Sequence, residues 1–115
     1  MSKYLDSAGL AQLWAQIKAD FPRMKHWSIS AGQSADFTVA AGSRMVLYTI
    51  GQVANLRGES IVTGGNSSVG RTAVKTASEI TFTASGLTLT VANGNASGYA
   101  VEVCFLIFVG GVTKS

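Results

Sequence analysis

The residues that most resemble a chemical motif form a glycine-rich stretch from Gly65 to Thr72. The stretch reads Gly-Asn-Ser-Ser-Val-Gly-Arg-Thr, which is close to the phosphate-binding pattern of Gly, four residues, Gly, Lys and then Ser or Thr. Arg71 takes the place of the lysine. A phosphate-binding loop leads into a helix, whereas no helical period follows here. We therefore interpret the stretch as a glycine-rich loop between two strands.

The other reactive side chains form no catalytic or metal-binding pattern. His26 is the only histidine and Cys104 the only cysteine, which excludes a His/Cys metal site and an intrachain disulfide. Cys104 lies within the apolar run Val103–Leu106, so we expect a buried and inert thiol. Six carboxylates fall on separate predicted elements: Asp6, Asp20, Asp36, Glu59, Glu79 and Glu102. We expect no enzyme active site, no cofactor and no metal.

The composition favours a single domain that buries part of its surface against other chains. The chain has 115 residues, a typical length for one domain. Hydrophobic residues make up 47% of it and charged residues 13%, whereas ordinary soluble domains have roughly 25% charged residues. A surface with few charges is typical of a subunit that contacts copies of itself or neighbouring proteins.

The net charge of +3 does not indicate nucleic-acid binding, because the nine Lys and Arg residues are scattered along the chain. The densest group is Lys18, Arg23 and Lys25, near the end of a predicted helix, where cations suit the helix C-terminus. No apolar signal-peptide region follows Lys3. The longest apolar run, Val103–Val109, is too short to cross a bilayer. We expect synthesis in a cytoplasm and no membrane insertion.

The only proline, Pro22, divides the chain into a helical segment and a β segment. The spacing of apolar residues predicts a helix over Ser7–Phe21, which Pro22 ends. Its apolar stripe consists of Leu10, Leu13, Trp14, Ile17 and Phe21. Such a short helix needs a partner, either the β segment or the same helix of other copies. We predict a helical docking and oligomerisation segment over residues 1–25 and a β-sandwich domain over 26–115.

After Pro22, apolar residues alternate with a period of two, and glycine-, asparagine- and serine-rich turns separate the alternating runs. The runs are short and no helix-sized gap interrupts them, which predicts an antiparallel, jelly-roll-like β-sandwich. Eight strands are predicted: Trp27–Ala31, Asp36–Ala40, Arg44–Ile50, Ser60–Thr63, Thr72–Lys75, Glu79–Ala84, Leu87–Ala92 and Tyr99–Val109. The fold class is therefore mainly β, with one short N-terminal helix.

The clearest hairpin signal spans Ile80–Val91, around a two-residue turn at Ser85-Gly86. This turn places threonines on one face and apolar residues on the other. It predicts three apolar pairs: Ala84 with Leu87, Phe82 with Leu89, and Ile80 with Val91. A shift of one residue would mix the two faces, so the alternation and the turn support each other.

The last predicted strand becomes apolar on both faces toward its end. One face begins at the polar Glu102 and continues through Cys104 and Leu106 to Phe108. The other face carries Val103, Phe105 and Ile107 throughout. We expect the end of this strand to be covered on both sides, by the N-terminal helix or at a subunit contact.

Four aromatic residues of the β segment have two interpretations: Trp27, Phe37, Tyr48 and Tyr99. They could line a sugar-binding surface, but aromatic residues in β-sandwiches usually anchor a core or an interface. No polar cluster accompanies them in the sequence. We therefore interpret them as core or interface anchors.

The segment Lys3–Lys18 is similar to a recurrent N-terminal pattern of Tyr-Leu-Asp, Gly-Leu, Leu-Trp and Ile-Lys. This pattern occurs in small structural proteins of phages and prophages from gut bacteria. Those proteins often continue into β domains rich in Thr, Ser and Gly, and the second half of this chain resembles such domains. The resemblance implies a bacteriophage virion protein without enzymatic activity, either a capsid decoration or head-fibre protein or a tail-appendage knob.

On this interpretation the chain is a homo-oligomer, expected to be a trimer, within the virion and in contact with other virion proteins. The apolar stripe of the helix would serve docking or trimerisation. Exposed loops of the β segment would contact host surface glycans through six residues: Asn66, Ser67, Ser68, Arg71, Asn93 and Asn95. The alternative is a small monomeric carbohydrate-binding module, which the oligomeric state distinguishes from a virion subunit.

Overall fold

The computed structural model describes Gly9, Gln12 and residues 23–115. Of the helix predicted over 7–21, only Gly9 and Gln12 belong to the described residues. The five residues of its apolar stripe all lie outside them: Leu10, Leu13, Trp14, Ile17 and Phe21. The prediction of this helix and its docking role therefore stays a prediction.

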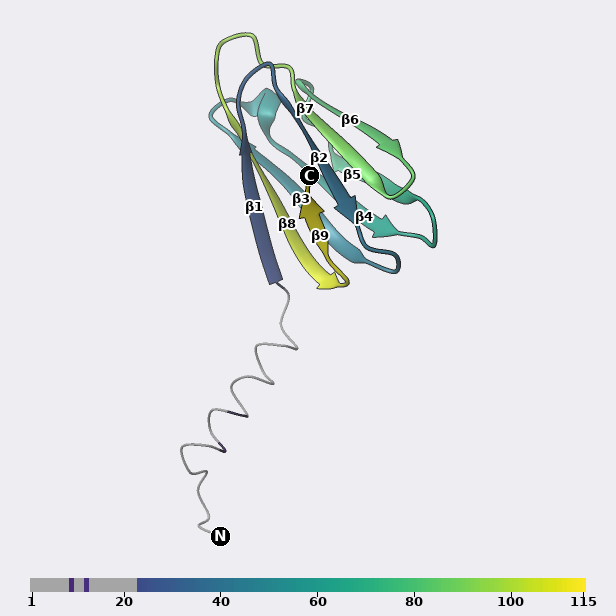
Figure 1. The fold of residues 1–115 in the computed structure, drawn as a ribbon. Helices are drawn as coiled ribbons and strands as arrows, with labels where there is room; N and C mark the ends of the chain where they lie inside the picture. The colour runs from purple at the N-terminus through teal and green to yellow at the C-terminus, as the bar shows by residue number, and fades with distance from the viewer. Residues whose placement is uncertain (1–8, 10–11, 13–22) are drawn as a thin grey trace.

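Residues 23–115 form two antiparallel β-sheets that pack face to face (Figure 1). The first sheet has the strand order β1 (Arg23–Ile29), β8 (Val101–Val109), β3 (Arg44–Gly51), β4 (Gly58–Gly64) and β5 (Val69–Lys75). The second has the order β6 (Ile80–Ser85), β7 (Thr88–Asn93), β2 (Ser34–Val39) and β9 (Val112–Lys114). A single 3₁₀ turn, η1 (Ala54–Leu56), lies between β3 and β4 in this part of the chain. The predicted mainly-β, sandwich-like class is confirmed, while the jelly-roll detail and the trimer stay predictions.

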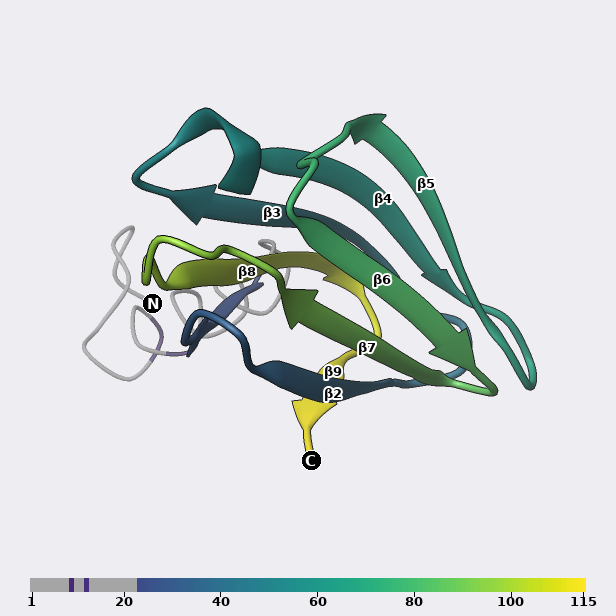
Figure 2. The same ribbon diagram turned by 90° about the horizontal axis from the view of Figure 1, so that it is seen from above.

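The core lies between the two sheets, which Figure 2 shows as two layers seen from above. Three aromatic rings anchor it: Trp27 of β1, Phe37 of β2 and Phe105 of β8. Their ring centroids are 5.2 Å apart for Trp27 and Phe37, 5.9 Å for Trp27 and Phe105, and 5.0 Å for Phe37 and Phe105. Such tilted and edge-on contacts are the geometries that aromatic pairs favour. Trp27 and Phe37 are thus core anchors, as the sequence predicts.

Most strands follow the predicted alternation, but their bounds differ, and β5 begins at Val69 rather than Thr72. The first strand begins at Arg23 rather than Trp27, because the residues after Pro22 pair with β8, from Arg23 opposite Ile107 to Ile29 opposite Val101. The three-residue strand β9 was not predicted. It is too short to show alternation, yet Val112 is buried opposite Val39 of β2.

The hairpin of β6 and β7 exists, but its predicted register is wrong by two residues. The structure pairs Ser85 with Thr88 and Ala84 with Leu89, so the turn is Gly86-Leu87. Gly86 has a φ of +57°, and a positive φ at the first central residue only is typical of a type II′ turn. A shift of two residues leaves every side chain on its predicted face. The threonines are therefore on the outer face, as expected.

The aromatic cluster gives a test of the core. We expect Phe105→Ala to lower the free energy of unfolding by about 3–5 kcal/mol, because it removes a fully buried ring and leaves a cavity. The matched control is Thr83→Ala on the exposed face of β6, with an expected change below about 1 kcal/mol. Urea denaturation followed by tryptophan fluorescence measures both. Equal effects of the two substitutions would contradict the central role of the aromatic cluster.

Candidate functional site

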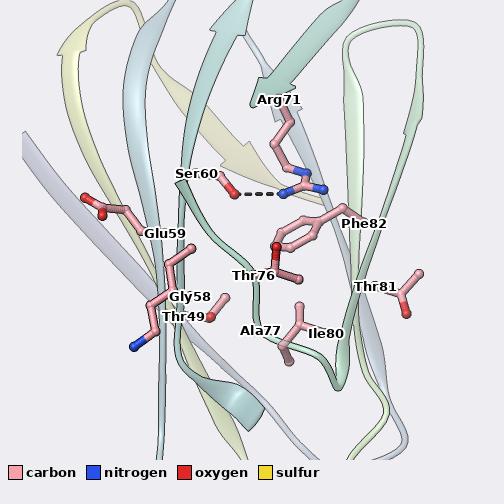
Figure 3. Close-up of a pocket in the computed structure, with 11 residues that line it drawn as sticks. Thr49, Gly58, Glu59, Ser60, Arg71, Thr76, Ala77, Ile80, Thr81 and Phe82 are labelled. Carbon is pink, nitrogen blue, oxygen red and sulfur yellow. Dashed lines mark hydrogen bonds between the residues drawn. The ribbon is translucent and has the colours of Figure 1, made fainter. Parts of the chain in front are cut away.

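A cavity opens where the end strands of the two sheets, β5 and β6, separate. Its volume is about 270 Å³. Its lining includes Thr49, Ser60, Arg71, Thr76, Ile80 and Phe82 (Figure 3). They come from β3, β4, β5, β6 and the connection between β5 and β6. The cavity is therefore built by tertiary packing of both sheets.

The path of the chain between β5 and β6 forms one end of the cavity. The register of β4 and β5 shifts between Glu59, which pairs with Lys75, and Ser60, which pairs with Ala73. The connection then passes so close to Gly58 that a Cβ there would lie 2.9 Å from the carbonyl oxygen of Lys75. Ala77 in this connection is buried. The β-bulge and the glycine together let the chain cross from one sheet to the other at this point.

Arg71 links the two sheets across the mouth of the cavity. One guanidinium nitrogen donates a hydrogen bond to Ser60 Oγ at 2.8 Å. The guanidinium carbon lies 4.0 Å from the centroid of the Phe82 ring, which is a cation–π geometry. The side chain is exposed to solvent, and no ion pair joins it to a carboxylate in the part of the chain that the structure describes. The guanidinium of Arg71 is thus fixed in position, and no carboxylate among the described residues neutralises its positive charge.

Two buried hydroxyls line the cavity beneath Arg71. Ser60 accepts the hydrogen bond from Arg71, whereas Thr49 Oγ1 has no hydrogen-bond partner among the described residues although Thr49 is only 3% exposed. A buried hydroxyl without a partner is unfavourable by about 1–3 kcal/mol. Glu59 points away from the centre of the cavity, as does Thr81 (Figure 3). The cavity lining therefore combines two cationic side chains, Arg71 and Lys75, with a hydroxyl that lacks a hydrogen-bond partner and an aromatic wall.

The predicted loop residues Asn66, Ser67 and Ser68 lie in an exposed turn between β4 and β5. Arg71 is three residues further on, within β5, and takes part in the cavity. Residues 65–68 connect the two strands, whereas residues 69–72 of the glycine-rich stretch already belong to β5, so the interpretation of the stretch as a loop holds for its first half.

Asn93 and Asn95, which the sequence places in exposed loops that contact glycans, are buried, so the prediction of their exposure is wrong. They are 1% and 7% exposed, and their side chains organise the connection between β7 and β8. Asn93 Nδ2 donates to the carbonyl oxygens of Ile29 and Tyr99, both at 3.0 Å. Asn95 Oδ1 accepts from the backbone N–H groups of Ser97 and Tyr99 at 3.0 and 2.9 Å. Asparagine side chains often form turns in this way, so these two amides have a structural role.

The outer face of the five-stranded sheet carries an apolar row beside ionisable side chains, since Glu102 shares the outward positions of β8 and His26 lies opposite Cys104. Met24 lies opposite Leu106, Leu106 opposite Val46, and Val46 opposite Ile61, which makes one row across β1, β8, β3 and β4. Met24 is 64% exposed and Phe108, further along β8, is 56% exposed. Among the described residues, only the inward face of the end of β8 is covered, and its outward face is exposed. We call this surface, with Ile50 and Val74, the apolar outer face.

The outer face of the four-stranded sheet is polar by contrast. Thr83 of β6 lies opposite Thr90 of β7, which lies opposite Asp36 of β2. Thr90 Oγ1 donates a hydrogen bond to Asp36 Oδ1 at 2.6 Å. Thr38 and Thr88 are a further pair on this sheet. The two exterior surfaces of the sandwich therefore differ in chemistry.

The prediction that Cys104 is buried is wrong. Its neighbours Val103 and Phe105 point inward, so the alternation of β8 turns Cys104 to the apolar outer face, where it is half-buried. Partial burial, and secondly the charge of Glu102, raise the pKa of the thiol above its usual value. Glu102 Oε1 lies 2.6 Å from Nδ1 of His26, which is exposed.

The described residues contain neither a candidate metal cluster nor a candidate membrane span. No group of three or more His, Cys, Asp and Glu side chains that could hold a metal ion occurs among them. No helix in residues 23–115, or at Gly9 and Gln12, is long and apolar enough to cross a membrane.

The chain matches no protein-family model and no curated protein. Among solved structures, its fold is similar to part of the tailspike protein gp49 from Acinetobacter baumannii bacteriophage Fri1, a capsular polysaccharide depolymerase. The TM-score is 0.54 and the sequence identity 14%, so the likeness concerns the fold. It covers 100% of this chain and 24% of the tailspike chain. The chain therefore spans about a quarter of that protein.

The raised pKa of Cys104 predicts how the rate of thiol alkylation depends on pH. A thiol with a raised pKa stays protonated to higher pH, so alkylation by iodoacetamide should be slow at pH 8 and accelerate as the pH rises past 9. We expect Glu102→Gln to lower this pKa and speed alkylation at pH 8. The lower nucleophilicity of the more acidic thiol offsets part of that gain. Asp36→Asn, on the other sheet, is the control with the same charge change, and equal rates in both variants would contradict the assignment.

Proposed function

We propose that this chain is a structural module of a bacteriophage virion, within a tail appendage, that forms a homotrimer and contacts host surface glycans. The observation that carries the proposal is the likeness of the whole chain to part of a phage tailspike. The N-terminal pattern from Lys3 to Lys18 supports the same class of protein independently. Between the head and tail positions that this pattern leaves open, the tailspike likeness favours the tail.

The apolar outer face supports assembly of several copies. Contiguous exposed apolar surfaces are uncommon on monomeric proteins and are typical of interaction sites. The row through Met24, Leu106, Val46 and Ile61 carries no charge. It begins on β1, directly after the segment 1–22 that holds the predicted oligomerisation stripe. We propose that copies of the chain cover this face, arranged around a rotational axis as most homo-oligomers are.

We propose binding without cleavage as the role toward glycans. Most glycoside hydrolases use two carboxyl groups, about 5–9.5 Å apart, on either side of the scissile bond. Among the described residues, the cavity is lined by a single carboxylate, Glu59, which points away from its centre (Figure 3). This arrangement supports recognition of a sugar by Arg71 and hydroxyl groups.

A monomeric carbohydrate-binding module is the second candidate, and the cavity at Arg71 favours it equally. The oligomeric state separates the two functions. A virion subunit of the proposed kind should have about three times the chain mass of 11.9 kDa in light scattering coupled to size exclusion. A monomer at micromolar concentration would reject the trimer and favour the binding module.

The apolar outer face predicts the effect of a charge placed on it. Phe108→Glu should raise the dissociation constant of the oligomer about thirtyfold or more, because it removes an exposed aromatic anchor and adds a charge that must be desolvated. Thr83→Glu, on the polar face, adds the same charge and should leave assembly unchanged. Sedimentation velocity measures both, and far-ultraviolet circular dichroism confirms the β content. Dissociation of both variants alike would exclude the apolar face as the contact.

The N-terminal stripe gives a separate prediction. We expect Trp14→Ala to weaken assembly by about 2 kcal/mol or more, since aromatic anchors are frequent hot spots, and to leave the β-sheets folded. The same sedimentation and circular dichroism measurements apply. If this variant keeps its native oligomeric state and loses β structure, the stripe packs within its own subunit.

A further inference from the structure

We infer that the cavity between β5 and β6 binds one acidic sugar residue, with its carboxylate held by Arg71. This inference rests on the proposed contact with host glycans and adds the position and the chemical class of the ligand. Three observations carry it: an uncompensated and pre-positioned guanidinium, a buried hydroxyl without a partner, and a cavity of limited volume.

The first observation concerns the geometry of Arg71. Ser60 Oγ and the face of the Phe82 ring hold the guanidinium in one place, so little conformational freedom is lost when a ligand binds. A guanidinium has five N–H donors, of which the bond to Ser60 uses one. Two parallel donors match the two oxygens of a carboxylate, which accepts them as a bidentate pair. Since Glu59 points away, the ligand can supply the missing negative charge.

The second observation concerns Thr49. Its hydroxyl is buried beneath the cavity without a partner among the described residues and has almost no accessible surface. A rotation about χ1 of Thr49 would turn it toward a sugar hydroxyl, which is both a donor and an acceptor. Thr76, on the connection between β5 and β6, adds another hydroxyl to the lining (Figure 3). Ile80 and Phe82 supply apolar wall for the C–H groups of a sugar ring. Hydroxyl, carboxylate and C–H groups occur together in a uronic acid.

The third observation is size. Pockets for drug-sized ligands usually measure roughly 300–1,000 Å³, and this cavity of about 270 Å³ lies just below that range. It therefore suits one sugar ring, with the rest of a glycan outside. A mouth at the edge of the sandwich leaves room for such a chain to continue.

The test is a titration of the full-length, isotope-labelled protein followed by NMR. The probes are methyl β-D-glucuronide, methyl β-D-glucoside and inorganic phosphate. We expect the glucuronide to bind about tenfold or more tightly than the glucoside, because a charge-assisted bidentate pair is lost with the neutral sugar. Chemical-shift changes should be centred on Arg71, Ser60 and Thr76. Equal affinity for the two sugars, or an equal response to phosphate, would overturn the assignment to an acidic sugar.

Two variants at Arg71 separate charge from geometry. Arg71→Lys keeps the positive charge and loses the planar fork, so its affinity for the glucuronide should fall about tenfold. Arg71→Gln should abolish the preference for the glucuronide over the glucoside. Arg44→Gln removes another exposed arginine, on β3, and should change nothing. Retention of glucuronide binding by Arg71→Gln would reject the inference.

Thr49→Val adds a readout that a purely structural role would not produce. The substitution keeps the volume and removes the unpartnered hydroxyl, so we expect the melting temperature to stay equal or rise while glucuronide binding weakens severalfold. A lower melting temperature with unchanged binding would mean that the hydroxyl serves the fold alone. The outcome is independent of assembly: a trimer that ignores the glucuronide rejects this inference only, and a monomer that binds it rejects only the proposed virion role.

Discussion

The contact of Phe105 with Phe37 across the two sheets determines most of what is exposed on this molecule. Their ring centroids lie 5.0 Å apart, and both side chains are fully buried. Side chains alternate along a strand, so an inward Phe105 forces Leu106 and Phe108 outward. β8 lies between β1 and β3 in its sheet, and its outward residues therefore lie within the apolar outer face. One packing constraint thus fixes both the core and the surface that we propose other copies cover.

The cationic side chains at the two open edges of the sandwich make different contacts. At the edge of β1 and β9, Lys25 Nζ donates to the carbonyl oxygen of Val112 at 3.1 Å, and Arg23 donates to that of Gly110. These cations satisfy backbone groups between the sheets. At the edge of β5 and β6, Arg71 contacts a hydroxyl and an aromatic ring and keeps spare donors. The cavity is at this second edge because the bulged β5 and the crossing connection keep the sheets apart there.

The sequence predicts the strands well because alternation is a local property of the chain. It predicts contacts poorly because contacts join residues that are far apart in the sequence. The register error in the β6–β7 hairpin has this cause: a slip of two residues preserves the faces, so the pattern alone cannot reveal it. Asn93 and Asn95 look like exposed loop residues, and only the packed connection shows their amides turned inward. The sequence places Arg71 in a glycine-rich loop, whereas the structure places it on β5 at a cavity. Thr49 and Ser60, which sequence reasoning missed, carry a signal: they are polar residues on the inward positions of β3 and β4.

The small share of charged residues has two separate causes in this fold. On the four-stranded sheet, threonines replace charges, and Thr90 with Asp36 shows how such a face makes hydrogen bonds without an ion pair. On the five-stranded sheet, an apolar row replaces part of them beside His26, Glu59 and Glu102, and only this face argues for assembly. The cavity at Arg71 lies at the edge between the two faces. An oligomer that buries the apolar face therefore turns the threonine face outward and leaves the cavity open at its flank, where a surface glycan can reach it.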